Sequence, residues 1–193
     1  INSWFNLVLT LIGTPLPSGG SGALNHYLER DTDALMERTK NRPIPAGIIS
    51  PINALMFGIL LVLCGSTLLV WKINTLTGFL SILTAFLYIL VYTPMKKITW
   101  LNTSVGSIPG AIPPLGGWAA ATGRVDIQAI MVFGILFCWQ IPHFLAIAII
   151  YAKDYKIGGF KMLPSEYPES RRTQYHVLFF SIAMIGTSLG LYI

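Results

Sequence analysis

Residues 25–43 read NHYLERDTDALMERTKNRP, a run of charged and polar residues between two apolar stretches. Of the 13 basic and eight acidic residues in the chain, eight lie between positions 29 and 42. The rest is apolar, since 53% of the 193 residues are hydrophobic and 11% charged, with a mean hydropathy of +0.63. A soluble domain carries about 25% charged residues. The composition therefore predicts a membrane protein, in which the quoted stretch is a main polar surface.

Around this stretch the chain contains six apolar segments of about 20 residues, the length that spans a bilayer as a helix. They predict an all-α, polytopic membrane helix bundle embedded in lipid. Because the chain starts without a methionine and ends within an apolar run, we expect one transmembrane domain over residues 1–193, truncated at both ends. The predicted spans are roughly residues 3–28, 51–71, 76–93, 103–122, 127–150 and 174–193.

Two of these segments carry helix-breaking residues. Pro15 and Pro17 interrupt the first, where each removes a backbone donor. The segment 103–122 contains three prolines and several glycines. Non-helical backbone at membrane depth survives where it is buried in protein or lines a wet cavity, so we expect this segment to face the bundle interior. Close helix packing through small residues is the alternative.

The charged residues are concentrated in every second loop between the predicted spans. The segments 29–50, 94–102 and 151–173 hold 11 of the 13 basic residues and seven of the eight acidic ones. The positive-inside rule places these loops in the cytoplasm or, in a mitochondrion, in the matrix. A face that carries both signs predicts a binding site, and this clustering argues against nucleic acid as a partner. Cys64 and Cys138 lie in apolar segments, and we expect no disulfide between them.

The quoted stretch itself predicts a site for metal and phosphate. Asn25, Glu29 and Asp33 are spaced by four residues, which places their oxygens on one face of a helix. Carboxylates at this spacing repel unless a cation lies between them, and hard oxygen ligands suit Mg²⁺. Arg38 and Arg42 repeat the spacing, and guanidinium groups bind phosphate oxygens well. The alternative is a solvated helix end, with Glu29 or Asp33 paired to Arg30 or Arg38.

This pattern resembles the first motif of the UbiA superfamily of membrane prenyltransferases. The resemblance implies a nine-helix membrane fold, of which this chain would hold six helices. It also implies that the motif binds Mg²⁺ and an isoprenyl diphosphate. Asp31 lies off the acidic face and is a weaker candidate. The matching positions are Asn25, Glu29, Asp33, Met36, Arg38, Thr39, Arg42 and Gly47.

Further segments resemble the haem O synthase group of that superfamily. They are YTPMKK at 92–97, NTSVGSIPGAIPPLGGWAAATG at 102–123, WQIPHF at 139–144, KDY at 153–155 and MLP at 162–164. The resemblance implies transfer of a farnesyl group from farnesyl diphosphate to a vinyl group of protohaem IX, with addition of water, giving haem O and diphosphate. It further implies a bacterial or mitochondrial inner membrane, and haem-assembly proteins of terminal oxidases as partners.

The resemblance extends the candidate site to later segments. Many superfamily members carry two acids four residues apart in a second motif, but Ile150 and Gly158 flank Asp154 here, so Asp154 stands alone. His143 is a candidate haem-facing residue, and a satisfied core histidine is the alternative. The candidates are Asn25, Glu29, Asp33 and Asp154 for catalysis and the metal; Arg38, Arg42, Lys96, Lys97 and Lys153 for the diphosphate; and His143, Trp139 and Tyr92 for haem.

Three other functions compete with this interpretation. A related prenyltransferase would use a quinone precursor or chlorophyllide as acceptor, and the WQIPHF segment favours haem over these. A non-catalytic haem-binding membrane protein would need His143 but not the acidic face. A transporter would carry charges near mid-membrane, whereas the acids here lie at the ends of predicted helices.

Overall fold

The computed structural model describes residues 4–192, and these contain helices and loops but no strand. A π-helix, η1 (Leu87–Tyr92), joins α4 to α5, and a 3₁₀ turn, η2 (Gly190–Tyr192), follows α10. The α-helices are α1 (Trp4–Gly13), α2 (Pro15–Asp33), α3 (Pro51–Lys72), α4 (Thr75–Phe86), α5 (Thr93–Met95), α6 (Asn102–Thr122), α7 (Ile127–Ile150), α8 (Ala152–Ile157), α9 (Leu163–Glu166) and α10 (Arg172–Leu189).

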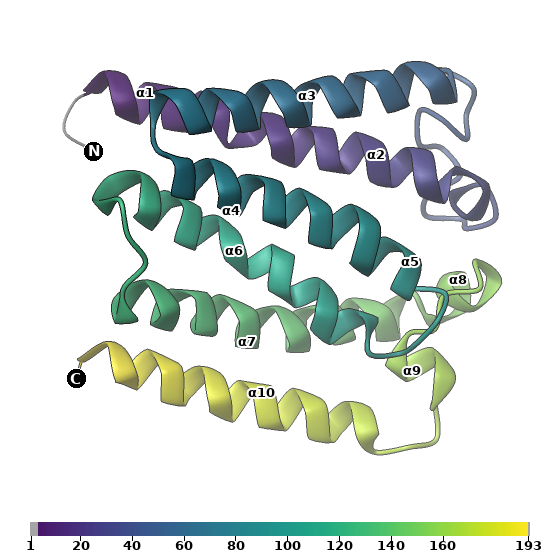
Figure 1. Ribbon diagram of the computed structural model, residues 1–193. Coiled ribbons are helices and arrows are strands. Elements are labelled where there is room, and N and C mark those ends of the chain that lie inside the picture. The colour runs from purple at the N-terminus through teal and green to yellow at the C-terminus, as the bar shows by residue number, and fades with distance from the viewer. Residues whose placement is uncertain (1–3, 193) are drawn as a thin grey trace.

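The long helices lie side by side in nearly the order of the sequence (Figure 1). Helix α2 packs on α3, α3 on α4, α4 on α6, α6 on α7 and α7 on α10. The α3–α4 and α6–α7 connections are short, as antiparallel neighbours allow, whereas longer polar segments join α2 to α3 and α7 to α10. The predicted all-α bundle is confirmed.

Within residues 4–192 all six predicted spans form helices, but they are not equally suited to a bilayer. Four helical stretches of the described residues are long and apolar enough to cross a membrane: Trp4–Asp33, Pro51–Lys72, Thr75–Met95 and Ile127–Ile150. Helices α6 and α10 do not combine the length and the hydropathy that a membrane-spanning helix needs. Helix α6 is rich in glycine and proline, and α10 begins with the polar run Arg172–His176. Both nevertheless lie alongside the other long helices (Figure 1).

The two prolines near the N-terminus leave the helical path nearly continuous. Thr14, between α1 and α2, has helical dihedral angles (φ −77°, ψ −39°), and its N–H donates to the carbonyl of Thr10 at 3.0 Å. Pro15 is the first residue of α2, where a proline needs no donor and its fixed φ suits the helix. Pro17 is buried against Gly65 of α3, whose missing side chain leaves room for it.

Helix α6 faces the bundle interior, as the sequence predicts, but it does so as an unbroken helix. Ten of its residues are buried, including Pro109. Its glycines admit side chains from neighbouring helices: the ring of Tyr92 lies against Gly106, and the amide of Gln140 lies against Gly110. Close packing through small residues is therefore the correct account of this segment.

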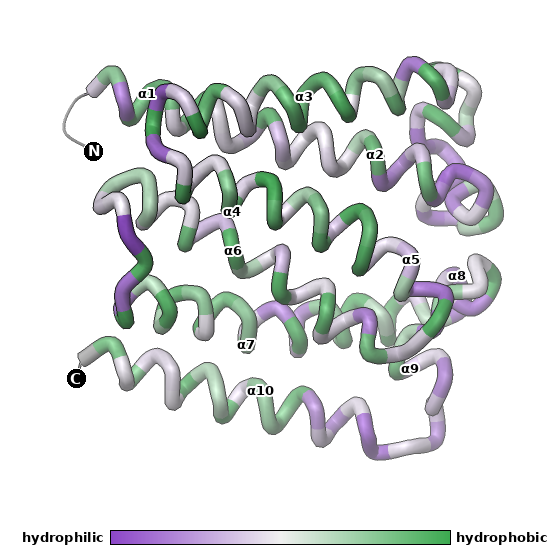
Figure 2. The backbone as a smooth tube through the Cα atoms, viewed as in Figure 1, coloured by the Kyte–Doolittle hydropathy of each residue, from purple (hydrophilic) through white to green (hydrophobic). Residues whose placement is uncertain are grey.

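The polar loops gather at one end of the bundle, on the right in Figure 2. This end holds the loop after α2, the α5–α6 connection and the segment around α8 and α9 (Figure 1). The α3–α4 and α6–α7 connections lie at the other end, where Asp126 caps α7 by accepting from the N–H of Ala129. Partial burial acts to raise the pKa of Asp126, but hydrogen bonds from Ala129 and Trp118 and the charge of Arg124 outweigh it and lower this pKa.

Candidate active site

The last two turns of α2 present Asn25, Glu29 and Asp33 on one buried face. Their exposed fractions are 5%, 4% and 0%, whereas the side chain of Asp31 is 87% exposed. The four-residue spacing thus gives the shared face that helix geometry predicts. A buried carboxylate is costly unless it is paired, so the partners of these side chains define the site.

Each member of this face has a partner from another segment. Asp33 Oδ2 accepts from Arg42 Nη1 at 2.7 Å. Lys96 Nζ lies 2.9 Å from Oε1 and 3.1 Å from Oε2 of Glu29. Asn25 Nδ2 donates to Thr93 Oγ1 at 3.1 Å. The alternative of exposed pairs with Arg30 or Arg38 is therefore wrong for both Glu29 and Asp33.

Two carboxylate oxygens on this face remain without a hydrogen bond among the described residues: Glu29 Oε1 and Asp33 Oδ1, both buried. Lys96 Nζ is close to Glu29 Oε1, but hydrogen-bond geometry is met at Oε2. Buried acceptors without a hydrogen bond are costly, and this cost falls mainly on Asp33 Oδ1, because Glu29 Oε1 has the Lys96 ammonium 2.9 Å away. A metal cation at this face would compensate it. Such an ion would need further ligands, because no group of three or more Asp, Glu, His or Cys side chains in residues 4–192 is placed to hold a metal. Mg²⁺ fits this set, since it commonly takes one or two carboxylates plus substrate phosphate oxygens.

The loop after α2 folds back over the acidic face and carries both arginines with it. Thr39 Oγ1 donates to the carbonyl of Asp33 at 3.0 Å. Met36 anchors the loop in a small core with Ala148, Phe160 and Met162. This core ties the first motif to α7 and to the residues that follow α8.

Asp154 joins the site through this loop. Its Oδ2 accepts from the backbone N–H of Arg38 at 3.0 Å. The guanidinium of Arg38 lies over the rings of Tyr151 and Tyr155, with its carbon 5.2 and 5.6 Å from the two centroids. The structure thus brings the single acid of the second motif next to the first motif, 116 residues away in sequence.

Lys96 is the best enclosed cation of the site. It is 9% exposed, and its Nζ lies 4.7 Å from the ring centroid of Tyr92 and 5.6 Å from that of Phe160. Its carbonyl accepts from the N–H of Lys161 at 2.7 Å. Asn102, fully buried, clamps this junction by donating to the carbonyls of Thr99 (2.6 Å) and Lys161 (2.8 Å).

Sequence reasoning did not single out Thr93, Asn102, Phe160 or Tyr151 as members of the site. Thr93 and Asn102 lie in segments that resemble the haem O synthase group, but no spacing pattern in the sequence indicated a role for either residue. By contrast, Lys97 and Lys153, predicted for the diphosphate, are exposed side chains at the same polar end.

The three residues predicted for haem are not brought together. Tyr92 packs beside Lys96, and its ring contact among the described residues is with Tyr88. Trp139 and His143 stack on each other on an exposed face of α7, with centroids 4.9 Å apart and planes at 11°. His143 is exposed, so the alternative of a core histidine is wrong.

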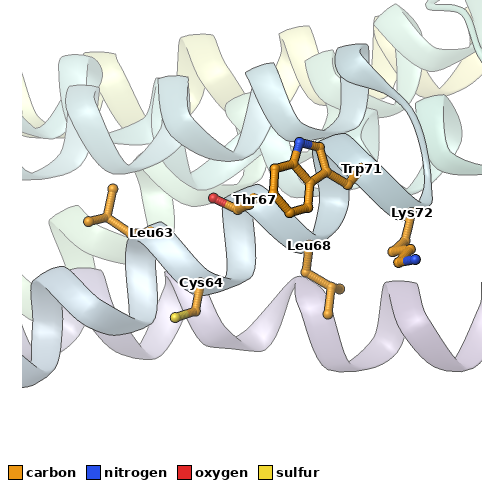
Figure 3. A pocket seen from close by; sticks show the side chains of 6 residues that line it. All are labelled: Leu63, Cys64, Thr67, Leu68, Trp71 and Lys72. Carbon is orange, nitrogen blue, oxygen red and sulfur yellow. The ribbon is translucent and has the colours of Figure 1, made fainter.

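A surface hollow on α3 is distinct from this site. Side chains one turn apart line it in two rows: Leu63, Thr67 and Trp71, and Cys64, Leu68 and Lys72 (Figure 3). Its lining residues belong to the C-terminal half of α3, and this end of the helix lies opposite the polar loops (Figure 1). Its lining is mostly apolar, and it contains none of the candidate site residues.

The sequence of the chain is similar to that of known proteins. The UbiA prenyltransferase family matches residues 1–193. The chain is similar to proteins named protoheme IX farnesyltransferase: it is 44% identical to that of Sorangium cellulosum over 183 residues, 95% of this chain and 65% of the relative. It is 47% identical to that of Salinibacter ruber, with the same shares, and 44% identical to that of Anaeromyxobacter dehalogenans, covering 95% of this chain and 62% of the relative. The chain thus spans less than two thirds of these relatives' length. No solved structure matches it.

Proposed function

This chain belongs to the UbiA prenyltransferase family, and we propose that it transfers a farnesyl group from farnesyl diphosphate to a vinyl group of protohaem IX. The relatives named protoheme IX farnesyltransferase support this choice of donor and acceptor. The observation that carries the proposal is the buried α2 face, where Asp33 Oδ1 and Glu29 Oε1 accept no hydrogen bond and the cations Arg42 and Lys96 lie beside the two carboxylates.

The side-chain charges of the site suit the binding of a diphosphate together with a metal ion. Glu29, Asp33 and Asp154 carry three negative charges, and the five cations predicted for the diphosphate carry five positive ones, so the candidate side chains have a net charge of +2 before substrate binds. A diphosphate adds negative charge that Mg²⁺ would offset. Its ligands would be Asp33 Oδ1, Glu29 Oε1 and the amide oxygen of Asn25, together with oxygens of the diphosphate. Asp154, also predicted for the metal, does not form a group of three metal-binding acids with Glu29 and Asp33 among the described residues, and its contact in the site is with the Arg38 backbone. When bound, Mg²⁺ supplies positive charge where the leaving diphosphate develops negative charge.

The protein's own cations complete the stabilisation of the leaving group. Arg42 and Lys96 are held in place by Asp33 and Glu29, and preorganised charges of this kind need no rearrangement during the reaction. Arg38, Lys97 and Lys153 are exposed at the same end and extend the positive surface toward the entering diphosphate. No protein nucleophile is required.

Bond changes in the proposed reaction are simple. The C–O bond between the farnesyl group and diphosphate breaks, and the electron pair leaves with the diphosphate. The vinyl π electrons of protohaem form the new C–C bond, and water captures the resulting cation and loses a proton, leaving a hydroxyl. Aromatic faces near Lys96 and Arg38, those of Tyr92, Tyr155 and Phe160, would stabilise the allylic cation. The stacked Trp139 and His143 would contact the haem.

The four long apolar helices and the family make this an integral membrane protein. We place it in a bacterial or mitochondrial inner membrane, with the polar loops on the cytoplasmic or matrix side. Haem-assembly proteins of terminal oxidases are the proposed partners, because the haem substrate and the haem product dissolve poorly in water.

An assay with defined substrates tests this proposal. Full-length protein in lipid nanodiscs receives protohaem IX, farnesyl diphosphate and Mg²⁺, and mass spectrometry looks for haem that has gained a farnesyl group and water. We expect Asp33→Ala to lower the rate by about 10² or more, since loss of preorganised charge has costs of this size. The matched control Asp31→Ala, exposed and off the face, stays within about twofold.

Three results would change the proposal. Full activity in Asp33→Ala contradicts the metal assignment. Product from a quinone precursor or chlorophyllide, and none from protohaem, moves the chain to another acceptor. Unchanged haem binding in His143→Ala removes the contact assigned to that histidine.

A further inference from the structure

Thr93 makes two hydrogen bonds that together determine how Asn25 is oriented. It lies where η1 meets α5 and is 6% exposed. Its Oγ1 donates to the carbonyl of Tyr88 at 2.9 Å, and Asn25 Nδ2 donates to the same Oγ1 at 3.1 Å. Both contacts are inside the bundle, where water does not replace a lost partner.

The hydrogen atoms in this chain of contacts can be assigned by counting. A threonine hydroxyl has one hydrogen, and a backbone carbonyl can only accept. The hydroxyl hydrogen of Thr93 is therefore committed to Tyr88, and Oγ1 is left as an acceptor. Asn25 must present its NH₂ group to Thr93, because two acceptors facing each other would repel. The carbonyl oxygen of the Asn25 amide is then turned away from Thr93.

The π-helix explains why Thr93 is placed to do this. The N–H of Thr93 also reaches the carbonyl of Tyr88, five residues back, so the wide turn directs both donors of Thr93 to one acceptor. The same turn sets the phase of the residues that follow, and Lys96, three positions later, meets Glu29. Thr93 thus faces Asn25, and Lys96, one turn later, faces Glu29. Single π turns are frequent at functional sites.

We propose that Thr93 is a positioning residue that orients the amide of Asn25, so that its oxygen faces the cation held by Glu29 and Asp33. This rests on the proposed function, in which that face binds a metal diphosphate. Without the Thr93 hydroxyl the amide can rotate and present its NH₂ group to the cation. An NH₂ group cannot act as a metal ligand, so binding of the metal is weakened while the fold is kept.

The test compares three hydroxyl variants of the full-length protein. Thr93→Val keeps the shape and removes the hydroxyl, and Thr93→Ser keeps the hydroxyl. Thr84→Val is the matched control, since Thr84 Oγ1 also donates to a carbonyl within its own helix, that of Leu80 at 2.8 Å. Electron paramagnetic resonance measures the binding of Mn²⁺, as a visible substitute for Mg²⁺, in the presence of inorganic pyrophosphate.

We expect Thr93→Val to weaken Mn²⁺ binding about tenfold or more, the usual cost of losing a residue that orients a metal ligand. Thr93→Ser and Thr84→Val stay close to the unaltered protein. Thermal unfolding monitors the fold, and Thr93→Ala replaces the valine variant if that variant unfolds early. Wild-type Mn²⁺ binding in Thr93→Val, or failure of Thr93→Ser to retain it, would overturn the proposal.

A double-variant cycle separates this proposal from the proposed function. If Thr93 acts through Asn25, Thr93→Val has no further effect on Mn²⁺ binding in an Asn25→Ala background. An equal weakening in both backgrounds contradicts the orienting role. If Asn25→Ala itself binds Mn²⁺ like the unaltered protein, the metal role of Asn25 fails, whatever the Thr93 variants do.

Discussion

Lys96 carries the charge that balances Glu29 inside the protein. Their side chains are 11% and 6% exposed, so water screens neither charge well. A buried pair of this kind adds little net stability, because both ions lose their hydration. Removing one partner is different, since the other charge is then left buried and uncompensated. Lys96 is therefore tied to stability as well as to the proposed binding of diphosphate.

Neighbouring lysines allow a matched test at this scale. We expect Lys96→Ala to lower the free energy of unfolding by about 3 kcal/mol or more and to abolish transfer activity. Lys97→Ala, at an exposed position, leaves stability within about 0.5 kcal/mol. Thermal unfolding in detergent measures both variants.

A compensating variant separates stability from chemistry. Glu29→Gln combined with Lys96→Met removes both buried charges, so it regains much of the stability that Lys96→Ala loses. It does not regain activity, because the cation and the carboxylate are both absent. A Lys96→Ala protein as stable as Lys97→Ala would contradict the buried pair.

At the scale of helices, α2 and α3 approach each other through glycines. A Cβ atom on Gly58 would lie 2.7 Å from Leu24 Cγ and 2.9 Å from the carbonyl oxygen of Gly20. The contact with Gly20 is to backbone, which cannot move away as a side chain can. Small residues of this kind let membrane helices pack closely. Since α2 carries the acidic face, this contact also determines how that face meets α5.

We therefore expect Gly58→Ala to lower the free energy of unfolding by about 1–3 kcal/mol, the usual cost of overpacking. The control is Gly186→Ala in α10, where no heavy atom outside the local helix lies within 4 Å of the added Cβ. That variant is neutral or gains up to about 1 kcal/mol from helix propensity. Equal unfolding temperatures for the two variants would show that the α2–α3 contact is not tight.

At the scale of the whole molecule, the bundle has one polar end and one sparsely charged end. The loops around the site lie at the first end, and the α6–α7 connection with Arg124 lies at the other (Figure 2). Antiparallel helices force this alternation, because each crossing moves the chain from one end to the other. If the bundle spans the bilayer, the two ends face different compartments.

Labelling from each side tests that topology. In a background with Cys64→Ala and Cys138→Ala, a membrane-impermeant maleimide should label Glu166→Cys from the cytoplasmic or matrix side alone. Arg124→Cys, whose native side chain is 77% exposed, should be labelled from the opposite side alone. If both positions were labelled from the same side, α7, which lies between them, would not cross the membrane.

The amino-acid sequence by itself determined the helical segments and the acidic face. Apolar runs of about 20 residues must become helices in a bilayer, because every backbone donor and acceptor must be paired within the segment. Asn25, Glu29 and Asp33 share a face because helix geometry is local and repeats every 3.6 residues. Loop composition likewise separated the polar end from the other end.

Only the tertiary structure decided which groups meet that face. Glu29 pairs with Lys96, 67 residues away, and Asn25 with Thr93, 68 residues away. Asp154, predicted as a metal ligand, accepts a hydrogen bond from the backbone of Arg38. These contacts depend on helix packing and on the phase of the π-helix. A single added residue rotates every later side chain by about 100°, and no local spacing in the sequence reveals where such a turn occurs.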